Sequence, residues 1–177
     1  SAGNMAVIYM IQYIFRDLIA ALQYLPFGLL IGIPLGILLL CFTKKDANRR
    51  QRILPMVVFG FYLAVILTIT FLSRESGTRK GLDLELFSTW GINARNNAYV
   101  IENVLLFIPY GFVCCWAFKW ARGFLCCTLL GAVTSLTVEC LQLLTQRGYF
   151  QIDDILTNIL GSVIGWLVFR LFFTRRG

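Results

Sequence analysis

Long apolar runs alternate with short polar segments along this chain, and the runs have the length needed to cross a lipid bilayer. A helix of about 20 apolar residues spans the hydrocarbon core of a membrane. The runs are residues 24–42, 53–73, 98–118, 123–144 and about 153–173. The first two contain no charged residue, and the next two contain only Glu102 and Glu139. We therefore predict an all-α, polytopic membrane protein in which residues 24–177 form a bundle of about five transmembrane helices.

The N-terminal stretch, residues 5–23, is also apolar but has a polar face. Gln12, Arg16 and Gln23 recur at helical spacing on that face, with Asp17 beside them. This pattern is typical of an amphipathic helix that lies at the interface between lipid and water, which is our prediction. The alternative is a sixth transmembrane helix, in which Arg16 and Asp17 pair inside the bundle.

The composition agrees with a membrane protein and excludes several kinds of chemistry. Of the 177 residues, 58% are hydrophobic and only 14% are charged, whereas a soluble domain is about 25% charged. A soluble globular domain is therefore excluded. The chain has no histidine, so it has no Ser-His-Asp triad and no signal for a haem or zinc site. It carries no nucleotide-binding signal either.

The net charge of +7 is better explained by membrane topology than by nucleic-acid binding. Ten of the 16 Lys and Arg residues lie in the loop after the first run, in the loop after the third run and at the C-terminal end. Basic residues collect on the cytoplasmic side, so this side, including the C-terminus, is predicted to be cytoplasmic. Eight of the nine Asp and Glu residues then lie toward the outer side, and no nucleic-acid partner is expected.

Polar side chains follow one face of each of the last two predicted helices. In the fourth run the stripe consists of Gly131, Ser135, Glu139, Gln142 and Gln146. In the fifth run it consists of Asp154, Asn158, Gly161 and Gly165. Such stripes must face protein or water, because an Asp at the centre of a membrane helix costs about 2.5–3.5 kcal/mol on insertion scales. We expect the two stripes to meet, together with polar residues of the third run, in a cavity that opens to the outer leaflet.

This cavity is the candidate functional site. Its expected lining is Glu102, Asn103, Glu139, Gln142, Asp154 and Asn158, with Ser135 and Asp153 alongside. Arg74 begins the long polar loop of residues 74–97 at the membrane edge, where it could clamp a phosphate or a carboxylate. The alternative is structural: amides and hydroxyls join helices, Asp153 or Asp154 caps the last helix, and Arg74 only meets solvent or lipid headgroups. No metal site is assigned, since the six cysteines lie in apolar stretches.

Three segments in this order resemble the VanZ-like family of bacterial membrane proteins. They are Asn103 to Gly111 (NVLLFIPYG), the pair Glu139 and Gln142, and Asp153 to Gly161 (DDILTNILG). The resemblance covers roughly residues 99–165. Arg74 and the segment from Asp83 to Phe87 echo a further family pattern, although the family's proline is missing there. The resemblance implies a multi-pass protein of the bacterial cell membrane and, for the founding member, low-level resistance to the glycopeptide teicoplanin. It implies no established reaction.

Three functions are compatible with these observations. The first is binding: the outer cavity would recognise lipid-linked cell-wall precursor, teicoplanin or other lipid-linked envelope material, in contact with membrane lipids. The second is an enzyme for an envelope lipid, with Glu139 as general acid or base and Asp154 or Glu102 as its partner or as a ligand of Mg²⁺ or Ca²⁺. The third is a transporter, for which the chain lacks inverted repeats and a midplane relay. The oligomeric state and a role as a structural partner protein stay open.

Overall fold

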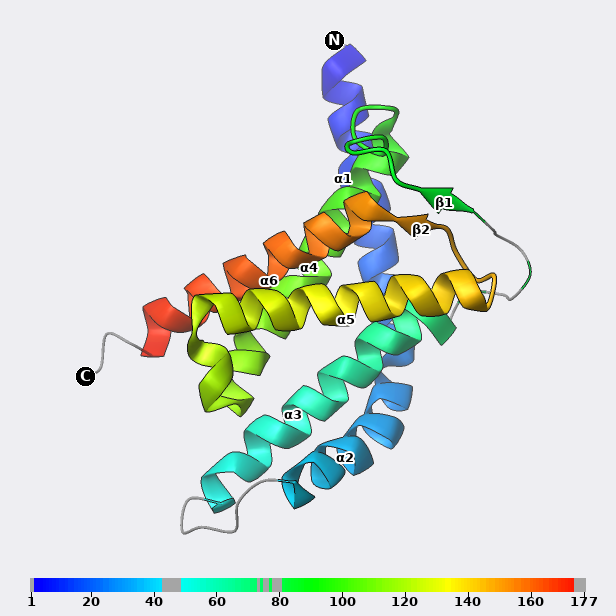
Figure 1. The fold of residues 1–177 in the computed structure, drawn as a ribbon. Helices are drawn as coiled ribbons and strands as arrows, with labels where there is room; N and C mark the ends of the chain where they lie inside the picture. The colour runs from blue at the N-terminus through cyan, green and yellow to red at the C-terminus, as the bar shows by residue number, and fades with distance from the viewer. Residues whose placement is uncertain (1, 43–48, 73, 75–76, 78–80, 174–177) are drawn as a thin grey trace.

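The computed structural model describes residues 2–42, 49–72, 74, 77 and 81–173. Figure 1 shows an almost entirely helical molecule. The long helices are α1 (Ala2–Ala21), α2 (Leu25–Cys41), α3 (Arg49–Leu67), α4 (Ala94–Ala117), α5 (Phe124–Leu144) and α6 (Ile152–Phe173). Within the described residues, five helical stretches are long and apolar enough to cross a membrane: Gly3–Cys41, Gln51–Leu72, Ala94–Ala117, Phe124–Leu144 and Ile152–Phe173. The prediction of an all-α, polytopic membrane protein is confirmed, with helix bounds within a few residues of those expected.

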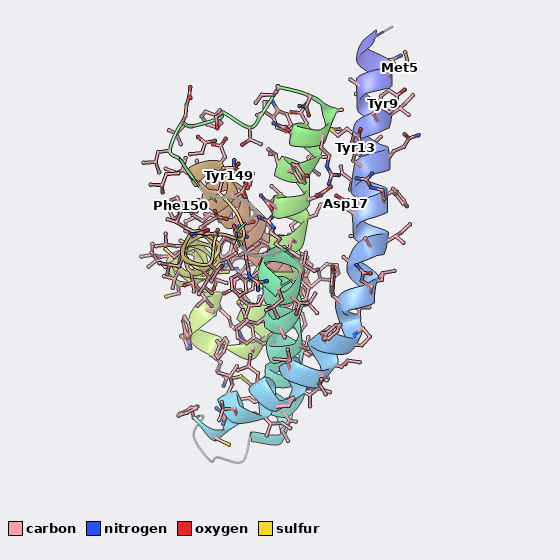
Figure 2. The ribbon with its side chains drawn as sticks, turned by 90° about the vertical axis from the view of Figure 1, so that its right-hand side faces the viewer. Met5, Tyr9, Tyr13, Asp17, Tyr149 and Phe150 are labelled. Atoms are coloured by element: carbon pink, nitrogen blue, oxygen red, sulfur yellow. The ribbon has the colours of Figure 1, made fainter. Side chains whose placement is uncertain are left out.

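The N-terminal stretch is helical and runs into α2 through one short turn, η1 (Leu22–Tyr24). The joined segment Gly3–Cys41 has 39 residues, and at 1.5 Å per residue it is about 58 Å long, nearly twice the hydrocarbon core. It therefore cannot lie wholly inside the core along the membrane normal. Figure 2 shows Tyr13 and Asp17 on the side of α1 that faces α4, while Met5 and Tyr9 lie nearer the N-terminal end. The interfacial position of residues 5–23 stays a prediction.

Helices α2 and α3 form a close antiparallel pair, visible at the bottom of Figure 1. Their backbones approach at glycines: a methyl group at Gly36 would lie 2.7 Å from the Met56 carbonyl oxygen, and one at Gly32 would lie 2.6 Å from the Phe61 nitrogen. No side chain fits into that space. Small residues at helix interfaces let membrane helices gain van der Waals contact, which is the main attraction available in lipid.

Helix α4 is the centre of the bundle, since it contacts α1, α3, α5 and α6. Its tightest neighbour is α6, where a methyl group at Gly165 would lie 2.8 Å from the Phe112 nitrogen and one at Gly161 would lie 2.8 Å from the Phe107 Cβ. Phe107 and Tyr110 are fully buried between the helices. This close approach brings the polar face of α6 against α4.

The loops at one end of the bundle are tied to each other by backbone hydrogen bonds. Two short strands, β1 (Leu82–Asp83) and β2 (Phe150–Gln151), pair in parallel with Leu82 opposite Phe150 and Asp83 opposite Gln151. The Phe150 N–H also donates to the Gly81 carbonyl oxygen at 3.0 Å. The hydrophobic pattern does not predict this pairing, because two residues are too few to show strand periodicity. As Figure 1 shows, the pairing joins the loop before α4 to the loop between α5 and α6.

Candidate functional site

A polar pocket of about 310 Å³ lies at this end of the bundle, between α4, α6 and the paired loops. Its lining is mixed: one arginine, two aspartates, amides and hydroxyls lie beside the apolar side chain of Ile92 and the rings of two tyrosines. The lining residues are Arg74, Asp83, Ser88, Thr89, Ile92, Asn96, Tyr99, Asn103, Tyr149, Gln151 and Asp154. Three predicted site residues, Arg74, Asn103 and Asp154, therefore share one pocket. Figure 2 places Tyr149, with Phe150, on the segment that leads into α6.

Asp154 is the charged residue that α6 contributes to the pocket from its first turn. Its carboxylate interacts with the side chain of Asn103 and lies within electrostatic range of Arg74. Arg74, Asn103 and Asp154 come from three different elements, so only the tertiary fold brings them together. A guanidinium, an amide and a carboxylate side by side can bind a ligand that carries both an anionic group and hydrogen-bond donors.

The segment that carries Arg74 is held by Arg147, which lies in the loop after α5. The Arg147 Nη1 donates to the Arg74 carbonyl oxygen at 2.6 Å, and its guanidinium lies 5.1 Å from the centre of the Phe71 ring. Helix α3 ends in a π-helical turn, Thr68–Leu72, whose Thr70 carbonyl oxygen accepts a hydrogen bond from Gln142 Nε2 at 2.7 Å. Turns of this kind are frequent at functional sites. Gln142 and Arg147 thus position the end of α3 beside the pocket.

Glu139 lies behind the pocket and is only 2% exposed. One of its carboxylate oxygens accepts a hydrogen bond from the Gln151 backbone N–H at 2.9 Å. It also lies within electrostatic range of Asp154 and Arg74. Because Gln151 itself lines the pocket, Glu139 sits one residue away from the space where a ligand would bind.

Ser135 and Asn158 form a deeper polar layer between α5 and α6. Asn158 Nδ2 donates to Ser135 Oγ at 2.8 Å, and Ser162 Oγ donates to the Asn158 carbonyl oxygen at 3.0 Å. All three side chains are buried. The part of the predicted stripe that lies on α5, from Gly131 to Gln142, therefore faces the interior, whereas Gln146 lies beyond the end of α5 and is exposed. Ser135 and Asn158, two predicted ligand-binding residues, join helices below the pocket instead of lining it.

Asp153 has a different partner from its neighbour Asp154. Its Oδ1 accepts the Phe87 N–H at 2.7 Å and its Oδ2 accepts the Thr89 N–H at 3.1 Å. Both carboxylate oxygens are thus occupied by the loop before α4. Because Asp153 is the second residue of α6, its carboxylate fastens that loop to the start of the helix.

Glu102 faces away from the pocket, toward α1. It is close to Asp17 and to Arg95, and its Oε1 is buried without a hydrogen-bond partner. Arg95 Nη2 lies 2.6 Å from Asp17 Oδ2, and its guanidinium lies over the rings of Tyr13 and Tyr99 at 5.1 and 4.3 Å. The expectation that Glu102 lines the same cavity as Asp154 is therefore wrong. Adjacent residues on a helix point about 100° apart, so when Asn103 faces the pocket Glu102 turns toward α1.

Asp83 is the pocket carboxylate that lies in a loop outside the apolar helices. Its Oδ2 accepts a hydrogen bond from Ser88 Oγ at 2.9 Å, and its Oδ1 accepts the Glu85 N–H at 3.2 Å. These hydrogen bonds, led by that from Ser88, stabilise the charged form and hold the pKa of Asp83 below its usual value. Asp83 therefore stays ionised near neutral pH.

No group of three or more Cys, Asp or Glu side chains is arranged to hold a metal ion within the part of the chain that the structure describes. Asp83 and Asp154 are the only two carboxylates that line the pocket there. A cation held at this point would have to take its other ligands from amide, hydroxyl or water oxygens, which Mg²⁺ and Ca²⁺ accept.

Sequence reasoning missed several residues of this site, namely Asp83, Asn96, Tyr99, Arg147, Tyr149 and Gln151. Four of them lie in the loops and two-residue strands between the helices, where periodicity gives no information about facing direction, whereas Asn96 and Tyr99 lie near the start of α4. Asp83 lies within the segment that resembles the family, but no feature of the sequence assigned it to the pocket. Arg147 belongs to the six basic residues that the charge pattern leaves on the outer side, and the pattern gives it no further role.

The comparisons with known proteins agree with this architecture. The family model VanZ/LLP1 matches residues 59–173, a region that includes every predicted site residue from Arg74 to Asn158. Protein VanZ of Enterococcus faecium is 30% identical over 127 residues, which are 72% of this chain and 76% of that protein. No solved structure matches. Together with the apolar helices, the match over more than half of the chain establishes that this multi-pass membrane protein belongs to the VanZ/LLP1 family.

Proposed function

We propose that the polar pocket binds the polar part of lipid-linked cell-envelope material, or of a lipoglycopeptide such as teicoplanin, and thereby protects bacteria from teicoplanin. The observation that carries this proposal is the meeting of Arg74, Asn103 and Asp154 in one pocket at the end of an apolar bundle. Such a pocket would offer charged and hydrogen-bonding groups close to the lipid that surrounds the apolar helices. A ligand with an apolar anchor and a polar head meets both conditions.

The pocket offers complementary groups for such a head. The Arg74 guanidinium can bind a phosphate or a carboxylate in a bidentate manner, while Asp83 and Asp154 accept hydrogen bonds from amines or hydroxyls. The amides of Asn96 and Asn103 can bind sugar or peptide groups both as hydrogen-bond donors and as acceptors. Cell-wall precursors and glycopeptides carry all of these groups.

The pocket is proposed to face the outside of the bacterial cell membrane. This follows from the excess of Lys and Arg in the loop after α2, in η3 (Lys119–Arg122) and beyond α6, which assigns that end and the C-terminus to the cytoplasm. The pocket lies at the other ends of these helices. Lipid-linked precursors and acylated glycopeptides are then both available from the outer leaflet.

The proposal is tested by the teicoplanin susceptibility of bacteria that express the wild-type chain, Arg74→Gln, Glu139→Gln or Asp154→Asn at matched membrane levels. Vancomycin serves as the comparison drug. We expect Arg74→Gln and Asp154→Asn to lose most of the protection, because each removes a charge from the pocket. Glu85→Gln is the matched control, since Glu85 is an exposed loop carboxylate that does not line the pocket. Full protection by both pocket variants would refute the assigned site, and no protection by wild type would refute the ligand class.

A second candidate function is an enzyme that modifies an envelope lipid. It is favoured by the burial of Glu139 within electrostatic range of Asp154, an arrangement typical of carboxylates used in acid–base catalysis. Mg²⁺ or Ca²⁺ could assist by binding Asp83 or Asp154. The purified chain would be incubated with an envelope-lipid extract, with and without each cation, and the products analysed by mass spectrometry. A new product that is absent with folded Glu139→Gln would establish the enzyme, whereas unchanged lipids would leave binding as the function.

A further inference from the structure

A second pocket, of about 410 Å³, adjoins the polar pocket and has an almost wholly apolar lining. It is lined by Phe87, Trp90, Val100, Asp153, Leu156 and Thr157. Both pockets lie between α4, α6 and the loop before α4. Their volumes fall within, or at the lower limit of, the roughly 300–1,000 Å³ of small-molecule sites.

The wall between the two pockets is the loop segment from Phe87 to Trp90. Phe87 and Trp90 line the apolar pocket, whereas Ser88 and Thr89 between them line the polar pocket. On α6, Asp153 lines the apolar pocket and its neighbour Asp154 lines the polar pocket. Neighbouring residues of the same elements thus face an apolar compartment and a compartment whose lining mixes polar and apolar groups.

This wall has a fixed position. Phe87 has a φ of 62°, a left-handed conformation that is uncommon for a residue other than glycine. Its N–H donates to the Asp153 carboxylate at 2.7 Å, and the same carboxylate accepts the Thr89 N–H. The two hydrogen bonds to the buried Asp153 therefore stabilise the wall in a backbone conformation that would otherwise be unfavourable in free energy.

The loop that forms the wall has an apolar surface, although its sequence suggested a polar loop. Its large exposed side chains are Leu82, Leu84, Leu86, Phe87, Trp90 and Ile92. Six such side chains within eleven residues are unfavourable in water, and Trp is enriched where membrane meets water. The loop is thus suited to lie against the outer leaflet, so that the apolar pocket opens toward lipid.

We propose that the apolar pocket takes a hydrocarbon chain of an outer-leaflet lipid whose head, carrying one phosphate and amine or hydroxyl donors, occupies the polar pocket. This inference rests on the proposed function and names the ligand class of the same site. The phosphate fits the single guanidinium of Arg74, and the donors fit the carboxylates of Asp83 and Asp154. An anionic head without donors would face two carboxylates and one arginine, which disfavours it.

The test uses the full chain in lipid nanodiscs and a phosphatidylethanolamine probe that carries a photoactivatable diazirine near the end of one acyl chain. After irradiation, mass spectrometry locates the cross-linked residues. We expect adducts to concentrate on the pocket residues Val100 and Leu156. A phosphatidylcholine probe, whose quaternary amine has no donor, is expected to give several-fold fewer adducts there.

Two variants fill the apolar pocket without changing the polar one, and both should lower cross-linking at the pocket several-fold. Val100→Phe fills it from α4. Leu156→Trp fills it from the partly exposed edge of α6, and serves if the first variant does not fold. Val133→Phe is the matched control, because Val133 is exposed on α5 outside both pockets.

The proposal is overturned if the adducts spread evenly over the lipid-facing helices, or if filling the pocket leaves them unchanged. Those results, with protection lost in Asp154→Asn, would refute the lipid pocket but keep the proposed function. Conversely, specific cross-linking together with full teicoplanin protection by Arg74→Gln and Asp154→Asn would refute the proposed function but keep the lipid pocket.

Discussion

Gly148 shows how a single small residue shapes the polar pocket. It is buried in the loop between α5 and α6, at the point where the side chains of Arg74 and Gln142 approach that loop. A methyl group there would lie 2.8 Å from Arg74 Nη1 and 2.9 Å from Gln142 Oε1. The position of the arginine thus depends on the absence of a side chain elsewhere in the chain.

Gly148→Ala is expected to displace the ends of the Arg74 and Gln142 side chains, which are flexible and can shift at low cost, so teicoplanin protection should fall more than the free energy of unfolding, which should change by less than about 1 kcal/mol. Thermal unfolding of the purified protein in detergent measures the stability, and teicoplanin susceptibility measures the function. Gly123→Ala is the control, because the nearest atoms to a methyl group there are 3.8 and 3.9 Å away. Full teicoplanin protection by Gly148→Ala would mean that the position of the arginine does not depend on this glycine.

The Ser88 hydroxyl is expected to control the ionisation of Asp83. The pKa of Asp83 lies below its usual 3.8, mainly because Ser88 donates a hydrogen bond to the carboxylate. The stability that this ionised group contributes is therefore present above pH 3.8 and is lost as the pH falls through the lower folded value. Ser88→Ala should raise the pKa of Asp83, and ¹³C NMR of Asp-labelled protein measures the midpoint. An unchanged midpoint would mean that the Ser88 hydrogen bond does not lower the pKa of Asp83. Thr128→Val, on the exposed face of α5, is the control and should leave the midpoint unchanged.

At the scale of elements, α1 and α4 are joined by charges that the hydropathy pattern alone does not assign to a partner. Arg95, near the start of α4, pairs with Asp17 of α1 and lies over aromatic rings from both helices. Glu102, about two turns further along α4, faces the same contact. This polar contact docks the N-terminal helix on the centre of the bundle.

A double-mutant cycle on Arg95→Gln and Asp17→Asn tests whether this pair holds α1 against α4. Both side chains are partly exposed, so we expect a coupling free energy of about 0.5–1 kcal/mol, similar to favourable exposed ion pairs. Thermal unfolding of the wild type, both single variants and the double variant supplies the four values. Additive effects would mean that the Asp17–Arg95 pair does not stabilise the contact between α1 and α4.

At the scale of the whole molecule, the ends of the bundle differ in charge and in structure. The pocket, the paired strands and most acidic residues gather at one end, while basic segments flank the helices at the other. Lipid favours this segregation, because charged loops between spans must leave the hydrocarbon and basic ones remain in the cytoplasm.

This arrangement predicts which positions a membrane-impermeant maleimide reaches in intact cells. Glu85→Cys, in the exposed loop beside the pocket, should be labelled, whereas Lys119→Cys, exposed in η3 at the other end, should be labelled only after the cells are opened. The wild-type chain with its six native cysteines supplies the background. The reverse pattern would turn the pocket toward the cytoplasm and refute binding from the outer leaflet.

The sequence by itself determined the helices and their buried faces. Apolar runs near 20 residues have few stable solutions in lipid, because every backbone polar group must be satisfied within the segment, so α2 to α6 were predictable to within a few residues. The inward stripe from Ser135 to Gln142 was predictable for a similar reason, since polar groups avoid hydrocarbon.

Only the tertiary structure decided which polar groups meet. Helical spacing shows that residues share a face, but it does not show which neighbour that face contacts, so Glu102 turned toward α1 while Asn103 turned toward Asp154. Loop residues have no periodicity at all. Asp153 accepts a hydrogen bond from the Phe87 N–H, and Arg147 donates one to the Arg74 carbonyl oxygen just beyond α3. Both bonds join residues far apart in the chain, so they depend on how the helices pack.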